Sequence, residues 1–222
     1  MKSLAARAAV KYFAGLLICM LLIFLPAGTM RFAGGWLFLG VLFLPMLVMG
    51  IVLLAKNPAL LEKRLGAKEE QSEQKLVVKL SGLMFLGGFI LSGLDFRFQW
   101  IQTPVWCSIA AAVVFLLGYG MYAEVLRENT YLSRTVEVQE NQQIIDTGLY
   151  GIVRHPMYTA TILMFVMIPL ILGSLVALPV FLLYPVLIML RIGNEEKVLE
   201  QGLQGYAEYR KKVKYRLFPL IW

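Results

Sequence analysis

The longest uncharged stretch of the chain is YTATILMFVMIPLILGSLVALPVFLLYPVLIML, residues 158–190. A membrane-spanning helix needs roughly 20 mostly apolar residues, so these 33 residues are too many for one span. Gly173–Ser174 interrupts the stretch near its middle, and Pro169, Pro179 and Pro185 are expected to bend the two arms. The stretch therefore predicts a tight helical hairpin in a membrane, with arms short enough for one to tilt or to stop before a full crossing.

The composition of the whole chain also indicates a membrane protein. Of its 222 residues, 59% are hydrophobic and only 16% are charged, and the mean hydropathy is +0.71. Average soluble chains carry about 25% charged residues, so this chain has too few polar side chains to cover a soluble domain. The same hydrophobicity excludes a disordered chain. The two cysteines, Cys19 and Cys107, lie in apolar stretches, which excludes a disulfide scaffold.

Four further apolar stretches predict spans at residues 12–28, 35–55, 80–94 and 104–123. Together with the hairpin they predict an all-α, polytopic membrane helix bundle of about six spans. The first apolar run is longer than that of a signal peptide and has no clear cleavage site, which favours an uncleaved anchor. We expect a single membrane domain over residues 1–222, with four N-terminal spans in 1–123 and a more polar C-terminal part in 124–222.

The charged residues are distributed unevenly, and this predicts the orientation. With six spans and a cytoplasmic N-terminus, 19 of the 21 basic residues fall on the cytoplasmic side, and only Arg31 and Arg97 lie opposite. Thirteen of the 14 acidic residues fall on the same side, Asp95 being the exception. Positive residues favour the cytoplasmic side, so both termini are predicted to be cytoplasmic. The net charge of +7 then needs no nucleic acid as a partner, and it adds attraction to anionic membrane lipids.

The candidates for chemistry lie in three polar segments on that side, residues 56–79, 124–157 and 191–222. In the first, residues 57–65 predict a short amphipathic helix that begins near Pro58. Its leucines would rest on the membrane, and Lys63 and Arg64 would face lipid phosphates. We favour a surface anchor for this helix over a cover for a substrate entrance.

The second segment ends in GLYGIVRHPMY, residues 148–158, which contains the single histidine of the chain, His155. Pro156 disfavours helix at His155 and suits the first position of the following helix. Arg154 and His155 would therefore stand at the mouth of the fifth span. Free backbone N–H groups gather there, and a helix start of this kind is a ready anion site. The alternatives remain an interfacial charge for Arg154 and a capping or packing role for His155.

In the third segment Arg191 and Glu195 lie four residues apart, so they share one face if the sixth helix continues. The alternative for Glu195 and its neighbour Glu196 is a solvated charge cluster. Metal and haem sites are not indicated by one histidine and two membrane cysteines. No glycine-rich phosphate loop is present, and the scarcity of charges within the spans argues against an ion pathway.

Residues 139–222 resemble the isoprenylcysteine carboxyl methyltransferase family of membrane enzymes. The resemblance rests on residues 148–158, the apolar hairpin, Glu195-Glu196, Tyr206-x-x-Tyr209 and the tail from Val213 to Pro219. It implies a methyltransferase that binds S-adenosylmethionine in a cytoplasmic pocket at the end of the C-terminal helices. It also implies a lipophilic substrate, with a carboxylate or thiol acceptor similar to isoprenylcysteine, and makes residues 124–222 the catalytic part.

The resemblance also assigns residues to the site. The implied cofactor-binding residues are Gln139, Gln142, Gln143, Ile144, Ile145, Tyr150, Arg154, His155, Pro156, Met157, Tyr158, Glu195 and Tyr206. Arg191 matches an arginine that meets the substrate, and we expect Arg191 and Glu195 to be catalytic. In these roles Arg154 would take the cofactor carboxylate, and Glu195 would accept from its amine or ribose hydroxyls.

Two other functions remain open. Membrane reductases of the sterol-reductase type share a similar Arg-His-Pro-x-Tyr helix and tail, but they use NADPH. The third reading is a membrane protein without enzymatic activity that retains a degenerate pocket. We expect a lipophilic substrate and membrane lipids as partners. We expect neither a metal nor a nucleic acid.

Overall fold

The structure is a computed structural model that describes residues 2–66, 72–101, 103–132 and 138–222. Two of the polar segments, 56–79 and 124–157, therefore lie partly outside the described residues. The described part is helical and contains no strand, which confirms the predicted all-α class. The helices are α1 Lys2–Ala27, α2 Ala33–Lys56, α3 Pro58–Gly66, α4 Ser72–Phe98, α5 Val105–Glu128, the 3-10 turn η1 Gly148–Gly151, α6 Pro156–Ile171, α7 Leu178–Phe181, α8 Leu183–Gly202 and α9 Tyr206–Lys212.

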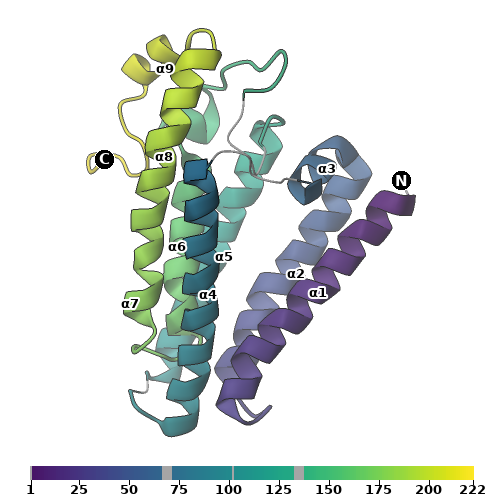
Figure 1. Ribbon diagram of the computed structural model, residues 1–222, viewed down its shortest axis with the longest axis vertical. Helices are drawn as coiled ribbons and strands as arrows, with labels where there is room; N and C mark the ends of the chain where they lie inside the picture. Colours follow the sequence, from purple (N-terminus) through teal and green to yellow (C-terminus); the bar gives the residue numbers. More distant parts are fainter. Residues whose placement is uncertain (1, 67–71, 102, 133–137) are drawn as a thin grey trace.

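Five helical stretches are long and apolar enough to cross a membrane: Ser3–Ala27, Ala33–Lys56, Gln74–Phe98, Val105–Glu128 and Leu178–Gly202. The protein is thus an integral, multi-pass membrane protein. The predicted hairpin is confirmed, with α6 as one arm and α7–α8 as the other (Figure 1). The shorter arm is α6, which has 16 residues. At 1.5 Å per residue it is about 24 Å long, less than the roughly 30 Å of a hydrocarbon core.

The turn of the hairpin is fixed by its two central residues. Gly173 has a φ of +76°, a left-handed conformation that glycine adopts without strain. The hydroxyl of Ser174 accepts a hydrogen bond from the backbone N–H of Ala177 at 3.2 Å. The same hydroxyl donates to a carboxylate oxygen of Asp95 on α4 at 2.5 Å, in a buried position. The turn is therefore tied to the neighbouring helix as well as closed locally.

Glycines allow the closest helix contacts in the bundle. A Cβ atom at Gly93 of α4 would lie 2.6 Å from the backbone oxygen of Ile23 on α1. A Cβ atom at Gly118 of α5 would lie 2.9 Å from Met164 and 3.2 Å from the backbone oxygen of Ala160, both on α6. Small residues at such points let helix backbones approach closely in membranes. These two contacts join α1 to α4 and α5 to α6.

Replacing Gly93 by alanine is expected to lower the free energy of unfolding by about 1–3 kcal/mol, because the backbone of α1 cannot give way as a side chain can. Thermal unfolding of the purified protein in detergent measures the change. Gly87→Ala on the same helix is the control, because no atom lies within 4 Å of its added Cβ. Equal stability of the two variants would contradict the close α1–α4 contact.

The polar helices gather at one end of the bundle, which we call the pocket end. Figure 1 shows α3, α9 and both chain termini at this end, and the pair α1–α2 leaning away from the other helices there. The predicted amphipathic helix is confirmed as α3, but its predicted contacts are wrong. Its leucines at positions 60 and 61 are buried in the protein. Lys63 donates to the side chain of Gln139 at 2.5 Å and Arg64 donates to the hydroxyl of Tyr122. Because only Asn57 separates α2 from α3, the short helix folds back onto the protein instead of lying on lipid.

Candidate active site

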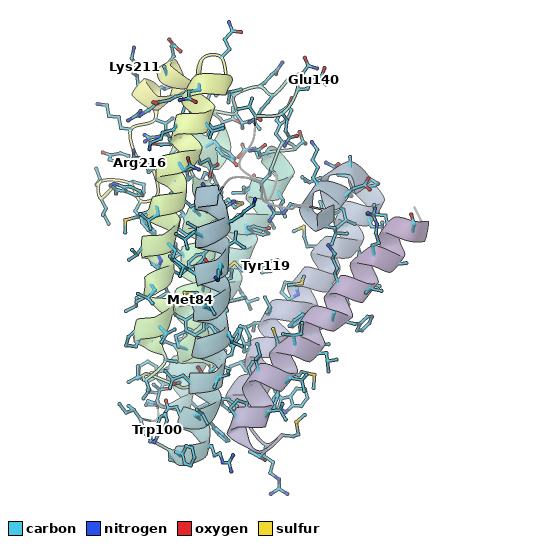
Figure 2. All side chains as sticks on the ribbon, in the orientation of Figure 1. Met84, Trp100, Tyr119, Glu140, Lys211 and Arg216 are labelled. Atoms are coloured by element: carbon cyan, nitrogen blue, oxygen red, sulfur yellow. The ribbon has the colours of Figure 1, made fainter. Side chains whose placement is uncertain are left out.

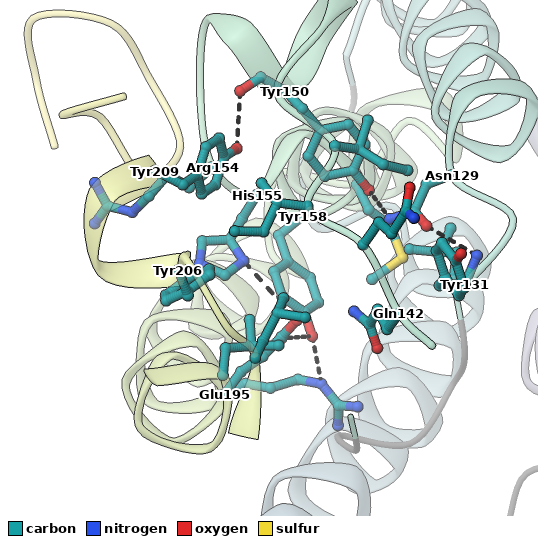
Figure 3. A pocket seen from close by; sticks show the side chains of 18 residues that line it. Asn129, Tyr131, Gln142, Tyr150, Arg154, His155, Tyr158, Glu195, Tyr206 and Tyr209 are labelled. Carbon is teal, nitrogen blue, oxygen red and sulfur yellow. Dashed lines mark hydrogen bonds and ion pairs between the residues drawn. The ribbon is translucent and has the colours of Figure 1, made fainter. Parts of the chain in front are cut away.

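A cavity opens at the pocket end, where α6, α8 and α9 meet the loop that precedes η1 (Figure 3). It holds about 890 Å³ of space between the surrounding side chains, a volume that includes the part open to solvent. Twelve of the predicted site residues line it: Gln142, Gln143, Ile144, Ile145, Tyr150, Arg154, His155, Met157, Tyr158, Arg191, Glu195 and Tyr206. Its lining combines charged side chains and aromatic rings with amide and aliphatic side chains.

Tyr158 joins the two residues predicted to be catalytic. Its hydroxyl donates to a carboxylate oxygen of Glu195 at 2.6 Å, and the same hydroxyl accepts from Nε of Arg191 at 2.8 Å. The phenol therefore stands between a cation and an anion and fixes both side chains at the wall of the cavity. Tyr158 itself is buried near the start of α6, with 5% of its surface exposed.

The spacing of residues on α8 explains why these groups meet. Arg191, Glu195 and Leu199 follow one another at intervals of four on α8, Leu203 follows directly after its last residue, and all four line the cavity. Residues at this interval lie on one face of a helix. The face begins with two charged side chains and ends with two apolar ones. The sequence therefore contained a signal for both leucines, although only the charged pair was predicted.

Glu196, the next residue along α8, does not line the cavity and forms a buried ionic network. One of its oxygens accepts from Nε and Nη2 of Arg154, both at 2.8 Å. The other accepts from Nε of Arg216 at 2.9 Å and Nη2 at 2.8 Å. A buried carboxylate is stable only when paired and hydrogen-bonded. Glu196 therefore fastens the residues before α6 and the chain after α9 onto α8.

This network also engages Arg154, which the sequence predicts to bind the cofactor. Besides Glu196, the guanidinium donates from Nη1 to the backbone oxygens of Val213 and Lys214, each at 2.8 Å. Only 6% of Arg154 is exposed. The backbone N–H groups of Arg154 and His155 also donate, to the oxygens of Tyr215 and Arg216 at 2.9 Å. The tail therefore covers part of the start of α6 and binds two of the backbone N–H groups that precede it.

His155 lies between Glu195 and Glu196 of α8. Its Nε2 is 3.3 Å from Glu196, and its Nδ1 is 4.0 Å from Glu195. Because a carboxylate that is paired with two arginines can only accept, Nε2 carries the proton in this contact. That leaves the lone pair of Nδ1 on the side of Glu195 when the ring is neutral. The ring also stacks on Tyr158, with centroids 5.8 Å apart.

Three further tyrosines line the cavity: Tyr150, Tyr206 and Tyr209 (Figure 3). The hydroxyl of Tyr150 accepts from Asn129 at 2.8 Å, and the hydroxyl of Tyr209 donates to the backbone oxygen of Tyr150 at 2.8 Å. The buried hydroxyl of Tyr206 has no hydrogen-bond partner among the described residues. Burial raises the pKa of all three phenols, so they remain neutral donors near neutral pH. A buried hydroxyl without a partner is costly, and its position in the cavity wall suits a bound polar molecule.

Two predicted cofactor-binding residues do not line the cavity. Gln139 binds Lys63, and its amide nitrogen donates to the backbone oxygen of Tyr131 at 2.5 Å. Its backbone N–H also orients Gln142, by donating to the Gln142 side-chain oxygen at 2.9 Å. Pro156 is buried at the first position of α6, where its missing N–H costs no hydrogen bond. Neither residue contacts the cavity, but each supports a residue or helix that does.

One known family matches part of the chain. Residues 98–201 match the model of the isoprenylcysteine carboxyl methyltransferase (ICMT) family. The match covers 104 of the 222 residues and supports the ICMT family for this chain. No curated protein matches the chain. The ICMT match runs from the end of α4 into α8, so it contains His155, Tyr158, Arg191 and Glu195, and it identifies a membrane methyltransferase.

Several cavity residues were not predicted as site residues: Asn129, Tyr131, Leu132, Leu199, Leu203 and Tyr209. Tyr209 belongs to the motif that suggested the ICMT family, so a signal for it existed. The loop after α5 contributes three more of these residues, Asn129, Tyr131 and Leu132. Its sequence has no helical or strand periodicity, so no pattern predicts that they reach the cavity. Among the described residues no group of three histidine, cysteine or acidic side chains is placed to hold a metal ion. The site thus offers one carboxylate, two guanidinium groups, of which that of Arg154 is paired with Glu196, one imidazole and a set of aromatic rings.

Proposed function

We propose that the protein transfers a methyl group from S-adenosylmethionine to a lipophilic substrate, with a carboxylate or thiol acceptor similar to isoprenylcysteine. The observation that carries the proposal is the bridge made by Tyr158. This bridge holds Glu195 next to Arg191. Glu195 suits a methyl donor with cationic groups and ribose hydroxyls, and Arg191 suits an anionic methyl acceptor. The ICMT family supports the methyltransferase class.

The residues of the cavity fit S-adenosylmethionine in their chemistry. Glu195 can accept from the amine or the ribose hydroxyls, and the hydroxyl of Tyr206 lacks a partner that a polar group of the cofactor would supply. Tyrosine rings attract a sulfonium as they attract other cations. Since Arg154 is bound to Glu196, the amide N–H groups of Gln142 are the donors we assign to the cofactor carboxylate. Ile144 and Ile145 offer an apolar surface for the adenine.

Bound S-adenosylmethionine supplies a methyl group on a sulfonium sulfur, which already carries its leaving group. The chain therefore contributes alignment and electrostatics more than bond activation. Arg191 holds a carboxylate acceptor as its anion, which needs no base. A thiol acceptor must lose its proton, and then Nδ1 of His155 or the carboxylate of Glu195 is the group placed to take it.

We propose further that both termini and the pocket end face the cytoplasm. Nearly all of the basic residues fall at this end, and such residues favour the cytoplasmic side. A lipophilic substrate would then enter from the cytoplasmic leaflet. Labelling of a cysteine introduced at Lys211 with an impermeant reagent in intact cells tests the orientation, and efficient labelling would contradict it.

Glu195→Gln is expected to weaken binding of S-adenosylmethionine about 10–100-fold, because it removes a charged acceptor worth about 1.5–3 kcal/mol. Calorimetry on the purified protein in detergent measures the dissociation constant. Glu200→Gln on the same helix is the control, because Glu200 pairs with Arg210 outside the cavity. The proposal is wrong if the folded wild-type protein binds neither S-adenosylmethionine nor its demethylated product.

A thermal-shift comparison separates the methyltransferase from the NADPH-dependent reductase. The methyltransferase predicts a higher melting temperature with S-adenosylmethionine and no change with NADPH. Stabilisation by NADPH alone would favour the reductase. Since Arg154 is occupied by Glu196, the cavity offers few cations for the phosphates of NADPH, which supports the first outcome. Stabilisation by neither ligand would favour the non-enzymatic reading.

A further inference from the structure

A second cavity lies on the other side of Arg154 from the active site. Its lining combines cationic with apolar side chains, among them Lys211, Lys214, Arg216, Leu220, Ile221 and Trp222. Arg154 forms part of the walls of both cavities. We propose that this second cavity binds an anionic phospholipid of the adjacent membrane leaflet. The proposal goes beyond methyl transfer and does not depend on it.

The positive charge of residues 210–216 favours an anionic ligand. Five basic residues lie between Arg210 and Arg216, and three of them have acidic partners within the protein. Arg210 pairs with Glu200, Lys212 with Asp146 at 2.6 Å, and Arg216 with Glu196. Lys211 and Lys214 are exposed and have no ion pair in the described part of the chain. Both line the second cavity, so two uncompensated cations face one space.

The apolar side chains next to these lysines are unusually exposed. Leu220 is 86% exposed and Ile221 is 80% exposed, more than any other large apolar side chain in the described residues. Neither belongs to a spanning helix. In water such a pair would be unfavourable, whereas in the apolar region of a bilayer it is favourable. Lysines and exposed aliphatic side chains in one cavity match a molecule with a charged head and an apolar tail.

The loop that carries these side chains is ordered. The backbone N–H groups of Arg216 and Leu217 both donate to the backbone oxygen of Trp222, at 2.9 and 3.1 Å. The N–H groups of Ile221 and Trp222 both donate to the oxygen of Phe218 at 3.2 Å. Leu220 has a φ of +67°, a left-handed conformation that a leucine rarely adopts. Strained residues of this kind point to a functional constraint, and here the strain presents two aliphatic side chains outward.

The position of the loop fits the surface of a membrane. Leu217 accepts from the hydroxyl of Thr159 in the first turn of α6 at 2.7 Å, and Arg216 is paired with Glu196 on α8. The loop thus lies at the level where α6 begins, beside α8 (Figure 1). This level is close to the edge of the hydrocarbon core, and the lipid headgroups lie just outside that edge. The Trp222 ring, under the guanidinium of Arg216 at 4.8 Å, suits this interface, and Figure 2 shows Lys211 and Arg216 along the same edge of the molecule.

Native mass spectrometry of the full chain in neutral detergent tests the proposal, with phosphatidylglycerol and phosphatidylcholine as probes. We expect tighter binding of phosphatidylglycerol by the wild type. Because each basic residue near a membrane surface contributes about 1 kcal/mol, Lys211→Gln with Lys214→Gln is expected to weaken that binding about tenfold or more. The matched control is Lys75→Gln with Lys79→Gln, which removes two exposed lysines of α4 outside the cavity.

The outcomes of this experiment are distinct. Equal binding of the two phospholipids by the wild type would overturn the proposal. An equal loss in the control pair would also overturn it, because it would indicate general attraction to positive charge. Ile221→Ser separates a lipid from a free phosphate: weaker phosphatidylglycerol binding supports the lipid. Unchanged lipid binding, with competition by inorganic phosphate, would show a simple phosphate site instead and reject the lipid.

Discussion

Replacing Glu196 by alanine is expected to destabilise the protein by about 3–5 kcal/mol, the usual cost of breaking a buried ion pair from one side. Without this carboxylate the guanidinium of Arg154, whose side chain is 4% exposed, loses its counter-ion. Arg216 loses its partner as well, and with it the attachment of the tail to α8. Thermal unfolding in detergent measures the loss of stability. Glu200→Ala is the control, and less than about 0.5 kcal/mol is expected there because its partner Arg210 is exposed.

A double variant separates this charge effect from a loss of packing. Arg154→Met combined with Glu196→Met removes both charges and keeps side chains of similar length. Replacing a buried ion pair by apolar residues is often close to neutral, so the double variant is expected to be more stable than Glu196→Ala. If both variants lose the same stability, the cost comes from packing and the ionic network is not what fastens the tail.

Arg191→Gln is expected to lower kcat/KM for a carboxylate acceptor about 100–1000-fold, within the range of about 2–5 kcal/mol for a charged partner that is lost from a buried pair. This prediction rests on the proposed methyl transfer. The affinity for S-adenosylmethionine is expected to change less than threefold, because Arg191 meets the acceptor and not the donor. Transfer of a radiolabelled methyl group to a prenylated cysteine measures the rate. Lys197→Gln, an exposed site on the same helix, is the control.

The same variant distinguishes the acceptor atoms. A carboxylate needs the cation of Arg191, whereas a thiol needs a base at His155 or Glu195. If Arg191→Gln keeps its rate with a lipophilic thiol and loses it with a carboxylate, Arg191 recognises the anion as proposed. Carboxylate methylation that stays within threefold of the wild-type rate would remove Arg191 from the proposed mechanism.

The fold could be predicted from the sequence to the extent that it depends on local patterns. Residues 158–190 predict the hairpin, its turn at Gly173–Ser174 and a short arm, because length and glycine position act locally. The predicted helix at 57–65 is present for the same reason. Its packing could not be predicted, because an amphipathic pattern does not say whether the apolar face meets lipid or protein. In α3 it meets protein.

In the candidate site, too, contacts between residues close in sequence could be predicted and contacts between distant residues could not. The interval of four residues from Arg191 to Glu195 predicts a shared face, and both side chains line the cavity. The pairing of Arg154 with Glu196 joins residues 42 positions apart, and no local pattern signals such a contact. A role as anion binder was therefore assigned to Arg154 from its place before a helix. Only the three-dimensional path of the tail reveals that this arginine pairs with Glu196 and donates to backbone oxygens of the tail.

The length of α6 has a consequence for how a substrate is reached. A helix of about 24 Å ends about 6 Å short of a hydrocarbon core roughly 30 Å thick. When the turn at Gly173 lies level with the far headgroups, His155 and Tyr158 sit at the depth of the first methylene groups of the near leaflet. A prenyl or acyl chain could then stay immersed while its polar end reaches Arg191. Extraction into water, at about 0.8 kcal/mol for each CH₂, would be avoided, and turnover would depend on how thick the surrounding bilayer is.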